Sequence, residues 1–393
     1  MPKKRGTIVL IGALPPPYMG PTLATEILLK STLTDRYRVI HLDTSDHRPL
    51  SKLAAIDYEN IRNAVSAFIR LFWLLATHKV DIVYVQVSQV TIGYLKDSIY
   101  IIIARFLGRS VVTHLRGGYF RHWYDSCGPL MRWYVRRVHS LVNAQIVLGE
   151  RLRALFDGIV DPRKVHVVPN GLNVPRPVHT STGGGVRFLF LSNLMRSKGV
   201  LEFVRAAALV HAARPAARFM LAGASATRKS ESCTEELETL LREHSAVPIE
   251  RLGAPRGEDK LAAFGRADVF VFPTYYPLEG HPWVLVEAMA ASLPIITCDQ
   301  AAVTESVLDG INGVIVPQRD PQSLAAAMIR LIDEPETRQR MARESRRLYE
   351  EQFTEEQMVA RLASVFQAVL DPSASTPPHP TSPTATGTVH ESQ

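Results

Sequence analysis

Residues 273–290 read Pro-Thr-Tyr-Tyr-Pro-Leu-Glu-Gly-His-Pro-Trp-Val-Leu-Val-Glu-Ala-Met-Ala, with Glu279 and Glu287 eight residues apart. The stretch follows an apolar run that predicts a β-strand, and Pro282 fits the first turn of a helix, where its missing N–H costs nothing. A carboxylate within an apolar helix is costly unless a partner hydrogen-bonds it. No polar residue lies within one helical turn of Glu287, so we expect a bound ligand to satisfy it.

The chemistry of that ligand follows from the same stretch. The free amides at the start of a helix suit an anion such as phosphate. Glu279 in the loop and Glu287 further along the helix could hold hydroxyl groups on either side of it. A phosphate flanked by hydroxyls describes a nucleotide sugar.

This glutamate, seven-residue, glutamate spacing resembles the signature of the retaining GT-B glycosyltransferases, in particular the large family 4 (glycosyltransferase group 1) of bacterial sugar transferases. Three further segments extend the resemblance: 168–171 (Val-Pro-Asn-Gly) resembles the interdomain turn, 192–199 (Ser-Asn-Leu-Met-Arg-Ser-Lys-Gly) the phosphate-gripping loop, and 288–313 the pattern that follows the second glutamate. Together they cover most of residues 165–332. The N-terminal half matches only in outline.

The fold that the resemblance implies agrees with the alternation of strand-like and helix-like stretches along both halves, which is typical of parallel α/β sheets. We expect strands near 7–13, 37–42, 81–86, 110–115, 144–148 and 164–168, and again near 186–192, 218–222, 249–252, 267–273, 295–298 and 313–316. The prediction is therefore an α/β protein of GT-B type, with two Rossmann-like parallel-sheet domains facing each other across a cleft.

Domain limits follow from composition. We expect an acceptor-binding domain over 1–172, a Pro- and Gly-containing linker over 173–185 and a nucleotide-sugar-binding domain over 186–370, whose last helix could return to the first domain. Residues 371–393 are rich in Pro, Ser and Thr, which predicts a disordered tail.

Composition also bears on location. With 46% hydrophobic residues among 393, the chain can bury two ordinary cores. Its three separated cysteines form neither a disulfide framework nor a metal spacing, which fits a reducing cytoplasm. The apolar run 8–14 ends at three prolines and is predicted to be a strand and not a signal sequence, and no apolar stretch approaches the length of a membrane span.

Charge is divided unevenly between the two halves. Residues 1–182 hold 24 Lys plus Arg against 12 Asp plus Glu, a net +12, and the remainder holds 21 against 26, a net −5. A basic half could meet nucleic acid, anionic lipid or an acidic acceptor. No nucleic-acid motif supports the first, so no nucleic-acid partner is expected.

Lys198 lies between a predicted strand and a predicted helix over 200–213. A cation there opposes the helix dipole, whereas a bound diphosphate would reverse that penalty. The alternative is a solvated loop lysine. The family usually has an arginine where this chain has Asn193, so the resemblance leaves either Arg196 as a substitute or a more loosely held phosphate.

Further donor contacts come from the resemblance. Gly20 in the loop 14–22 resembles the family's glycine-rich loop, although a plain turn is an equal alternative. Gly223 and Gly253 follow predicted strands, where glycines admit a base or ribose but are also ordinary turn residues. The remaining expected contacts in the loop between the strand and the glutamate helix are Thr274, Gly280, His281 and Trp283.

Two residues of the N-terminal half complete the expected site. His114 and Arg116 end a predicted strand, and residues two apart point to one side, so both are expected to face the cleft. Related enzymes usually have histidine immediately before the glycine, where this chain has Arg116. Which of the two takes the family histidine's role stays open, as does a purely structural role for the histidine.

The stretch 116–139 mixes arginines with aromatic residues, a composition that suits a membrane interface. The alternative is a helix that buries its aromatics and exposes its arginines. The apolar segments 68–75 and 99–106 are short enough to be core helices.

Together these features predict an enzyme that moves a sugar from a nucleotide-sugar donor to a carbohydrate or lipid-linked acceptor. We expect it in the cytoplasm, either free or peripherally attached to the inner face of the cell membrane. In the family, retention is attributed to a front-face displacement, for which Glu279, Lys198, His114 and Arg116 are the expected catalytic residues. No cofactor and no metal are expected, because the chain contains no Asp-x-Asp. A GT-B epimerase and an inactive nucleotide-sugar-binding module remain alternatives.

Overall fold

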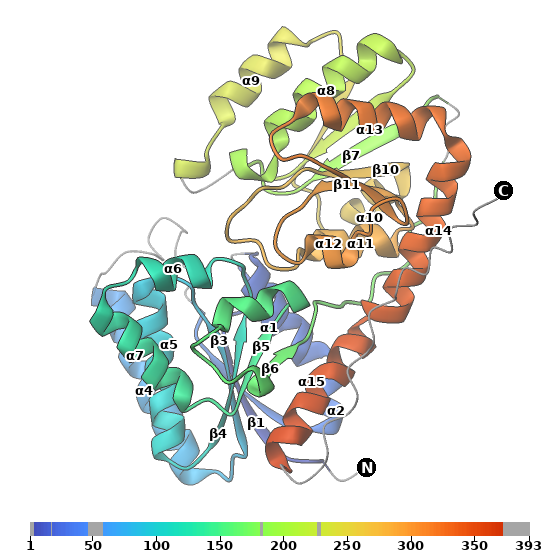
Figure 1. The fold of residues 1–393 in the computed structure, drawn as a ribbon. Helices are drawn as coiled ribbons and strands as arrows, with labels where there is room; N and C mark the ends of the chain where they lie inside the picture. The colour runs from blue at the N-terminus through green and yellow to red at the C-terminus, as the bar shows by residue number, and fades with distance from the viewer. Residues whose placement is uncertain (1–3, 17, 46–57, 181–183, 226–228, 372–393) are drawn as a thin grey trace, which may run out of the picture.

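The computed structural model describes residues 4–16, 18–45, 58–180, 184–225 and 229–371, and it consists of two α/β domains (Figure 1). The N-terminal sheet is parallel, with strand order β2-β1-β3-β4-β5-β6. Its strands are β1 Thr7–Gly12, β2 Arg38–Asp43, β3 Ile82–Val87, β4 Ser110–Leu115, β5 Ala144–Val147 and β6 Val165–Val167.

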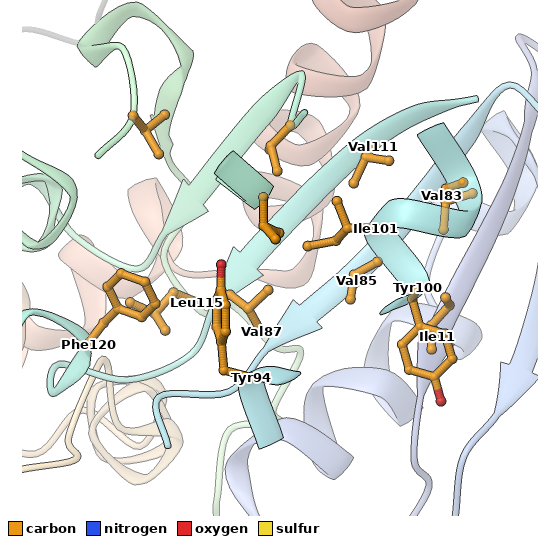
Figure 2. Close-up of a cluster of buried hydrophobic side chains, with 14 of the residues drawn as sticks. Ile11, Val83, Val85, Val87, Tyr94, Tyr100, Ile101, Val111, Leu115 and Phe120 are labelled. Carbon is orange, nitrogen blue, oxygen red and sulfur yellow. The ribbon is translucent and has the colours of Figure 1, made fainter. Parts of the chain in front are cut away.

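Helices cover both faces of this sheet. They are α1 Gly20–Lys30, α2 Leu33–Arg36, α4 Tyr58–Thr77, α5 Thr91–Phe106, α6 Phe120–Ser126 and α7 Pro129–Ser140, with 3-10 helices η1 Glu150–Phe156 and η2 Pro162–Lys164. The inner strands β1, β3, β4 and β5 are buried on both sides because helices cover both faces. Figure 2 shows one of these cores, in which Tyr94 and Ile101 of α5 pack on Val85 and Val111 of the sheet.

The C-terminal sheet is also parallel, with order β12-β11-β10-β7-β8-β9. Its strands are β7 Arg187–Leu191, β8 Arg218–Ala222, β9 Ile249–Gly253, β10 Val269–Phe272, β11 Ile295–Cys298 and β12 Gly313–Val316. Its helices are α8 Val200–Ala213, α9 Thr234–Glu243, α10 Gly257–Arg266, α11 Trp283–Ala290, α12 Val303–Ser306, α13 Pro321–Asp333 and α14 Pro335–Gln352, with 3-10 helices η3 Arg196–Lys198 and η4 Lys229–Glu231.

Each sheet has a point at which the strand order reverses, between β1 and β3 in the first domain and between β7 and β10 in the second. In open parallel sheets, ligands bind beyond the carboxyl ends of the strands at such a point. The segments that follow β7 and β10 contain Lys198 and Glu279, so the fold places these two residues at the switch point of the C-terminal sheet.

The last helix, α15 Glu355–Leu370, leaves the C-terminal domain along α14 and packs on the N-terminal sheet (Figure 1). Met358, Leu362 and Phe366 are buried in one cluster with Ile8 and Tyr84 of β1 and β3. The chain therefore crosses between the domains twice, once through residues 172–180 and once through α14 and α15.

The predicted fold class is confirmed, and each of the twelve expected strands is present with ends shifted by at most two residues. The helix expected over 200–213 is α8. Pro282 is the N-cap of α11 and not a residue of its first turn, so the helix begins at Trp283, slightly later than expected. The predicted disordered tail lies outside the described residues, except for Asp371. No helix in the described part of the chain is both long and apolar enough to cross a membrane.

Candidate functional site

The carboxyl-terminal edges of the two sheets face each other in close contact. A Cβ added at Gly118, after β4, would lie 2.4 Å from the Glu279 carbonyl oxygen, and one at Gly280 would lie 2.8 Å from that of Arg116. The Gly20 carbonyl accepts a hydrogen bond of 3.2 Å from the Trp283 indole. Glycine at 118 and 280 lets the two backbones approach more closely than any side chain would allow.

Lys198 and Glu279 form an ion pair at the switch point of the C-terminal sheet. Both side chains are largely buried, 12% and 10% exposed, and the Thr274 hydroxyl donates to the same Glu279 oxygen at 3.2 Å. The Lys198 ammonium also lies 4.7 Å from the Tyr276 ring centroid and 5.3 Å from that of Phe272. Aromatic faces and low exposure strengthen electrostatic interactions at this position.

Glu287 has a protein partner that local sequence did not reveal. The Lys260 ammonium, from α10, donates to Glu287 Oε1 at 2.5 Å. The expectation that only a ligand could satisfy this carboxylate is therefore wrong, because the partner comes from a helix 27 residues away. Glu287 Oε2 is buried without a hydrogen-bond partner among the described groups, so one acceptor remains for a hydroxyl.

The start of α11 supplies the expected amides. Pro282 is its N-cap with extended backbone (φ −66°, ψ 129°), so the chain turns into the helix immediately after it. The first N–H groups of an α-helix have no intrahelical acceptor, and those of Trp283 and Val284 are in this position. An anion is favoured there by the helix dipole.

The two expected phosphate contacts after β7 differ in position. Asn193 is exposed. Arg196 pairs with Glu236 of α9 at 2.7 Å, and this carboxylate raises the pKa of the arginine. Glu236 also pairs with Arg205. The charge of Arg196 is thus engaged by α9 in this structure, and its role as a substitute for the family's arginine stays a prediction.

His281 is a link between domains. Its Nδ1 accepts from the Asn170 amide at 3.1 Å, and its Nε2 donates to the Ser306 hydroxyl at 2.5 Å. The ring stacks on Phe353, and burial lowers the pKa of His281 to about 3. Both nitrogens are occupied, which corrects its assignment as a donor-sugar contact.

His114 and Arg116 lie on the same side of β4, as expected, and meet at one hydroxyl. Arg116 donates to the Tyr84 hydroxyl at 3.0 Å, which leaves that hydroxyl to donate to His114 Nδ1 at 2.7 Å. Burial, and then the charge of Arg116, hold the pKa of His114 well below its usual value. Because Tyr84 also packs on Phe366 of α15, His114 lies beneath that helix and not in the cleft.

Arg116 itself reaches the boundary between the domains. It is half-buried, and its guanidinium donates to Asn170 Oδ1 at 2.7 Å, while Asn170 Nδ2 donates to the His281 carbonyl at 2.6 Å. Of the two candidates for the family histidine's role, Arg116 is the one beside Gly280.

The two expected glycines near the base have backbone reasons for being glycine. Gly223 has φ +151°, and a Cβ there would lie 1.7 Å from the Ser192 carbonyl oxygen. Gly253 has φ +65°, in the left-handed region, with open space around it. The Gly223 amide donates to the Gly253 carbonyl at 2.6 Å, so the loops after β8 and β9 are joined.

A second interdomain contact was missed by sequence reasoning. Arg151, in η1, pairs with Asp299 and donates to the Thr304 hydroxyl at 2.6 Å. The Glu305 carboxylate accepts from the amides of Glu150 and Arg151 at 2.7 and 2.9 Å. These residues stand about 150 positions apart and carry no local motif, so only the fold brings them together.

The described residues contain no group of three or more His, Cys, Asp or Glu that could hold a metal ion. Positive charge at the site comes instead from Lys198 and from the start of α11. A buried cation, a carboxylate and free amides can together hold an anionic leaving group and adjacent hydroxyls in one orientation, which is the arrangement that positioning and charge stabilisation require.

Comparison with known proteins supports the resemblance. Residues 185–334 match the family model described as glycosyl transferases group 1. A glycogen synthase of Mycobacterium tuberculosis is 27% identical over 60% of this chain and 56% of its own. A putative colanic acid biosynthesis glycosyltransferase of Salmonella typhimurium is 27% identical over 53% of this chain and 52% of its own. The chain thus spans about half the length of these curated relatives.

Solved structures extend the fold over nearly the whole chain. The HepE protein of Anabaena, solved in complex with UDP, superposes with a TM-score of 0.71 at 16% identity, covering 92% of this chain and all of the other. This likeness concerns the fold, which is that of the GT-B glycosyltransferases. Residues 185–334 thus match the group 1 glycosyl transferase model, and they lie within a two-domain chain of GT-B fold.

Proposed function

We propose that the protein is a retaining glycosyltransferase that moves a sugar from a nucleoside-diphosphate donor to an acceptor hydroxyl. The observation that carries the proposal is the buried Lys198–Glu279 pair at the switch point of the group 1 domain, beside the start of α11. The binding of UDP by HepE, a protein of similar fold, agrees with a nucleotide ligand.

In the proposed reaction, the acceptor oxygen bonds to the anomeric carbon on the face from which the donor's phosphate oxygen leaves. The departing diphosphate takes up the proton of the acceptor hydroxyl. Lys198 and the amides of Trp283 and Val284 offset the charge that develops on the leaving group. Glu279 orients the sugar, and the free Oε2 of Glu287 accepts from a ribose hydroxyl. The protein acts by positioning and electrostatics, and no metal takes part.

The proposed acceptor is a carbohydrate or lipid-linked intermediate of a bacterial envelope polysaccharide. Relatives named for glycogen synthesis and colanic acid biosynthesis agree with a polysaccharide product. The basic N-terminal half agrees with an anionic or membrane-bound acceptor, and the protein would then act in the cytoplasm at the inner face of the membrane.

The test is a thermal-shift screen of the full chain with UDP, GDP and ADP and their common sugars. A ligand at 100 times its Kd raises the free energy of unfolding by about 2.7 kcal/mol. We expect one nucleotide series to raise the melting temperature, and Lys198→Ala to reduce that shift. Lys30→Ala, which removes an exposed lysine paired with Glu26, is the matched control and should leave it unchanged.

Turnover of the responding donor distinguishes the alternatives. Transfer to an added alkyl glycoside, with the donor's anomeric configuration preserved in the product's ¹H NMR spectrum, is the expected result. Isomerisation of the donor without acceptor would instead assign an epimerase. Binding with neither reaction over a broad acceptor panel would assign a binding module. No shift with any nucleotide would overturn the proposal.

A further inference from the structure

Helices α4 and α5 each carry a row of exposed apolar side chains. The row on α4 is Tyr58, Ile61, Val65, Ile69 and Phe72, and that on α5 is Ile92, Leu95, Ile99, Ile102 and Phe106. Successive members are three or four residues apart, the spacing that puts side chains on one face of a helix. Exposure ranges from 37% at Ile99 to 80% at Phe106, so these rows are not part of the core.

The opposite side of each helix is already occupied. Leu71 and Leu75 of α4 are completely buried on the N-terminal sheet, as are Tyr94 and Ile101 of α5, which Figure 2 shows. Each helix is thus apolar on the side that packs and again on the side that faces outward. A helix of this composition is usually buried on both sides.

The neighbouring helix α7 extends the surface with Leu130 and Trp133, 79% and 49% exposed. Thirteen of the nineteen exposed large apolar side chains in the described structure lie on α4, α5 and α7, with Trp73 among them. Figure 1 shows these three helices side by side on the N-terminal domain, on the side away from α15. We call the exposed residues of α4, α5 and α7 the outer face. Concentration on one face marks an interaction surface, whereas single exposed residues do not.

The outer face is basic. The three helices contain seven Lys and Arg against two acidic residues, and one of the two, Asp97, is buried and accepts from Ser88. Within the described ranges, Arg132, Arg136 and Arg137 of α7 pair with no carboxylate, while Arg136 donates to the Tyr124 hydroxyl and Arg137 lies over the Trp133 ring.

For the stretch 116–139 the alternatives were a membrane interface and a helix that buries its aromatics. Phe120, Trp123 and Tyr124 are buried, which agrees with the helix that buries its aromatics. Among the aromatic residues of this stretch, Trp133 is the one that is strongly exposed. The segments expected to be core helices, 68–75 and 99–106, do bury one side on the sheet, and their other side supplies part of the apolar surface.

We propose that the outer face docks on an anionic lipid bilayer, with α4 and α5 lying in the plane of its headgroups. Exposed apolar rows flanked by Arg, with Trp73 and Trp133 among them, have the composition of interfacial helices. A second copy fits less well, since a two-fold contact would bring the same arginines face to face. Anionic lipid supplies both the apolar phase and the opposite charge.

The outer face is continuous with the candidate site, which is the part of the inference that rests on the proposed function. Gln89, just before α5, accepts from the Tyr119 amide at 2.8 Å and packs against Gly117, next to the contact between Gly118 and Glu279. The exposed Val90 and Ile92 follow it directly. An acceptor anchored in the bilayer would therefore reach the site past the N-terminal end of α5. This route favours a lipid-linked acceptor over a free sugar.

The test is co-sedimentation of the full chain with vesicles of phosphatidylcholine and phosphatidylglycerol (70:30) and of phosphatidylcholine alone. We expect binding to the anionic vesicles that salt weakens, with quenching of tryptophan fluorescence by brominated lipid. Replacing Ile61, Ile69 and Phe106 by Gln should reduce partitioning at least about tenfold. Replacing Arg132, Arg136 and Arg137 by Gln should give a similar loss on anionic vesicles only.

The matched control replaces Val178, Leu209 and Ile311, three equally exposed apolar residues outside the outer face, and should change partitioning less than twofold. Circular dichroism and the nucleotide thermal shift check folding of every variant. Absent wild-type binding, or an equal loss in the control, would overturn the proposal. So would a wild-type dimer that the Ile61, Ile69 and Phe106 variant makes monomeric. Vesicle binding without any nucleotide response would overturn only the proposed function and the acceptor route.

Discussion

The two domains share one construction and differ in what their outer helices do. Each has six parallel strands with helices on both faces, but α8 of the C-terminal domain buries Val200, Leu201, Phe203 and Val204 and exposes one large apolar residue, Leu209. Helix α5 of the N-terminal domain buries one side and exposes five such residues on the other. The same fold thus yields a helix enclosed between neighbours and a helix available to a partner.

The facing edges differ as well. The C-terminal edge carries the Lys198–Glu279 and Lys260–Glu287 pairs, and the N-terminal edge meets it mainly with glycine backbone and with Arg116. Ion pairs at the site are therefore concentrated in the C-terminal domain, whereas both domains contribute a glycine to the close approach.

The largest expected effect is a difference between α8 and α5 in how much a Leu→Ala substitution lowers the free energy of unfolding. Leu201→Ala, at a site 1% exposed on α8, should lower the free energy of unfolding by about 2–5 kcal/mol because it leaves a cavity. Leu95→Ala, at a site 41% exposed on α5, should change it by less than about 0.5 kcal/mol. Urea unfolding measures both. Equal losses would mean that the outer face of α5 is packed in solution.

The second prediction concerns the charged edge. Lys198→Ala and Glu287→Ala should each lower donor turnover at least about tenfold, because each removes a charged hydrogen bond of about 1.5–3 kcal/mol. Lys198→Ala also leaves the largely buried Glu279 without its cation, so stability should fall as well. Steady-state rates at subsaturating donor measure the effect, with Lys30→Ala as control. Wild-type rates in either variant would remove that residue from the site.

The third prediction uses buried histidines. Burial lowers the pKa of His139, packed among Tyr94, Phe120 and Phe156, to about 3, as it does for His281. In the unfolded chain each titrates near 6.5, so between pH 6.5 and 3 the unfolded state binds more protons. The free energy of unfolding should therefore fall as pH falls through this window, by up to about 1.4 kcal/mol per pH unit for each histidine.

His139→Phe tests this in the N-terminal domain, because a phenyl ring fits among the same aromatics and cannot protonate. The slope of stability against pH between 6 and 4 should decrease by about 1.4 kcal/mol per pH unit. His122→Phe, at an exposed site, is the control. Urea titrations at four pH values give the slopes, and an unchanged slope in His139→Phe would show that this histidine is accessible to protons in the folded state.

The last prediction is that removal of divalent metal ions has no effect on sugar transfer. Because Lys198 and the start of α11 supply positive charge, EDTA should leave transfer unchanged. Inhibition by EDTA that Mn²⁺ or Mg²⁺ reverses would show that the C-terminal edge needs a metal to hold its ligand.

The fold could be predicted because its signals are local. Most strands are short apolar runs followed closely by Gly, Pro or a polar residue, and α8 shows helical spacing over its full length. Hydrophobic periodicity and turn residues were therefore sufficient to predict these elements. The exposure of apolar residues on α4 and α5 could not be predicted. A helix that is apolar on two sides has the same sequence pattern whether its outer side packs against another helix or faces solvent.

The candidate site was predicted less completely, for a related reason. Lys198, Thr274 and Glu279 were named from the family resemblance, and they lie together because loops after neighbouring parallel strands converge. The partners Lys260 for Glu287 and Glu236 for Arg196 come from helices distant in sequence, and no local pattern announces them. His281 was misassigned because its two partners, Asn170 and Ser306, lie in separate segments.

The return of α15 to the N-terminal sheet has a consequence for synthesis on the ribosome. Ile8 and Tyr84 are covered by Leu362 and Phe366, which emerge more than 270 residues after them. Leu28 and Leu33 of α1 and α2 cover part of the same side, so the first sheet must wait with the remainder of that side uncovered until translation has passed the entire C-terminal domain. A nascent chain stalled before residue 355 would be a substrate for chaperones that bind exposed apolar strands, and adding the α15 peptide in trans should complete it.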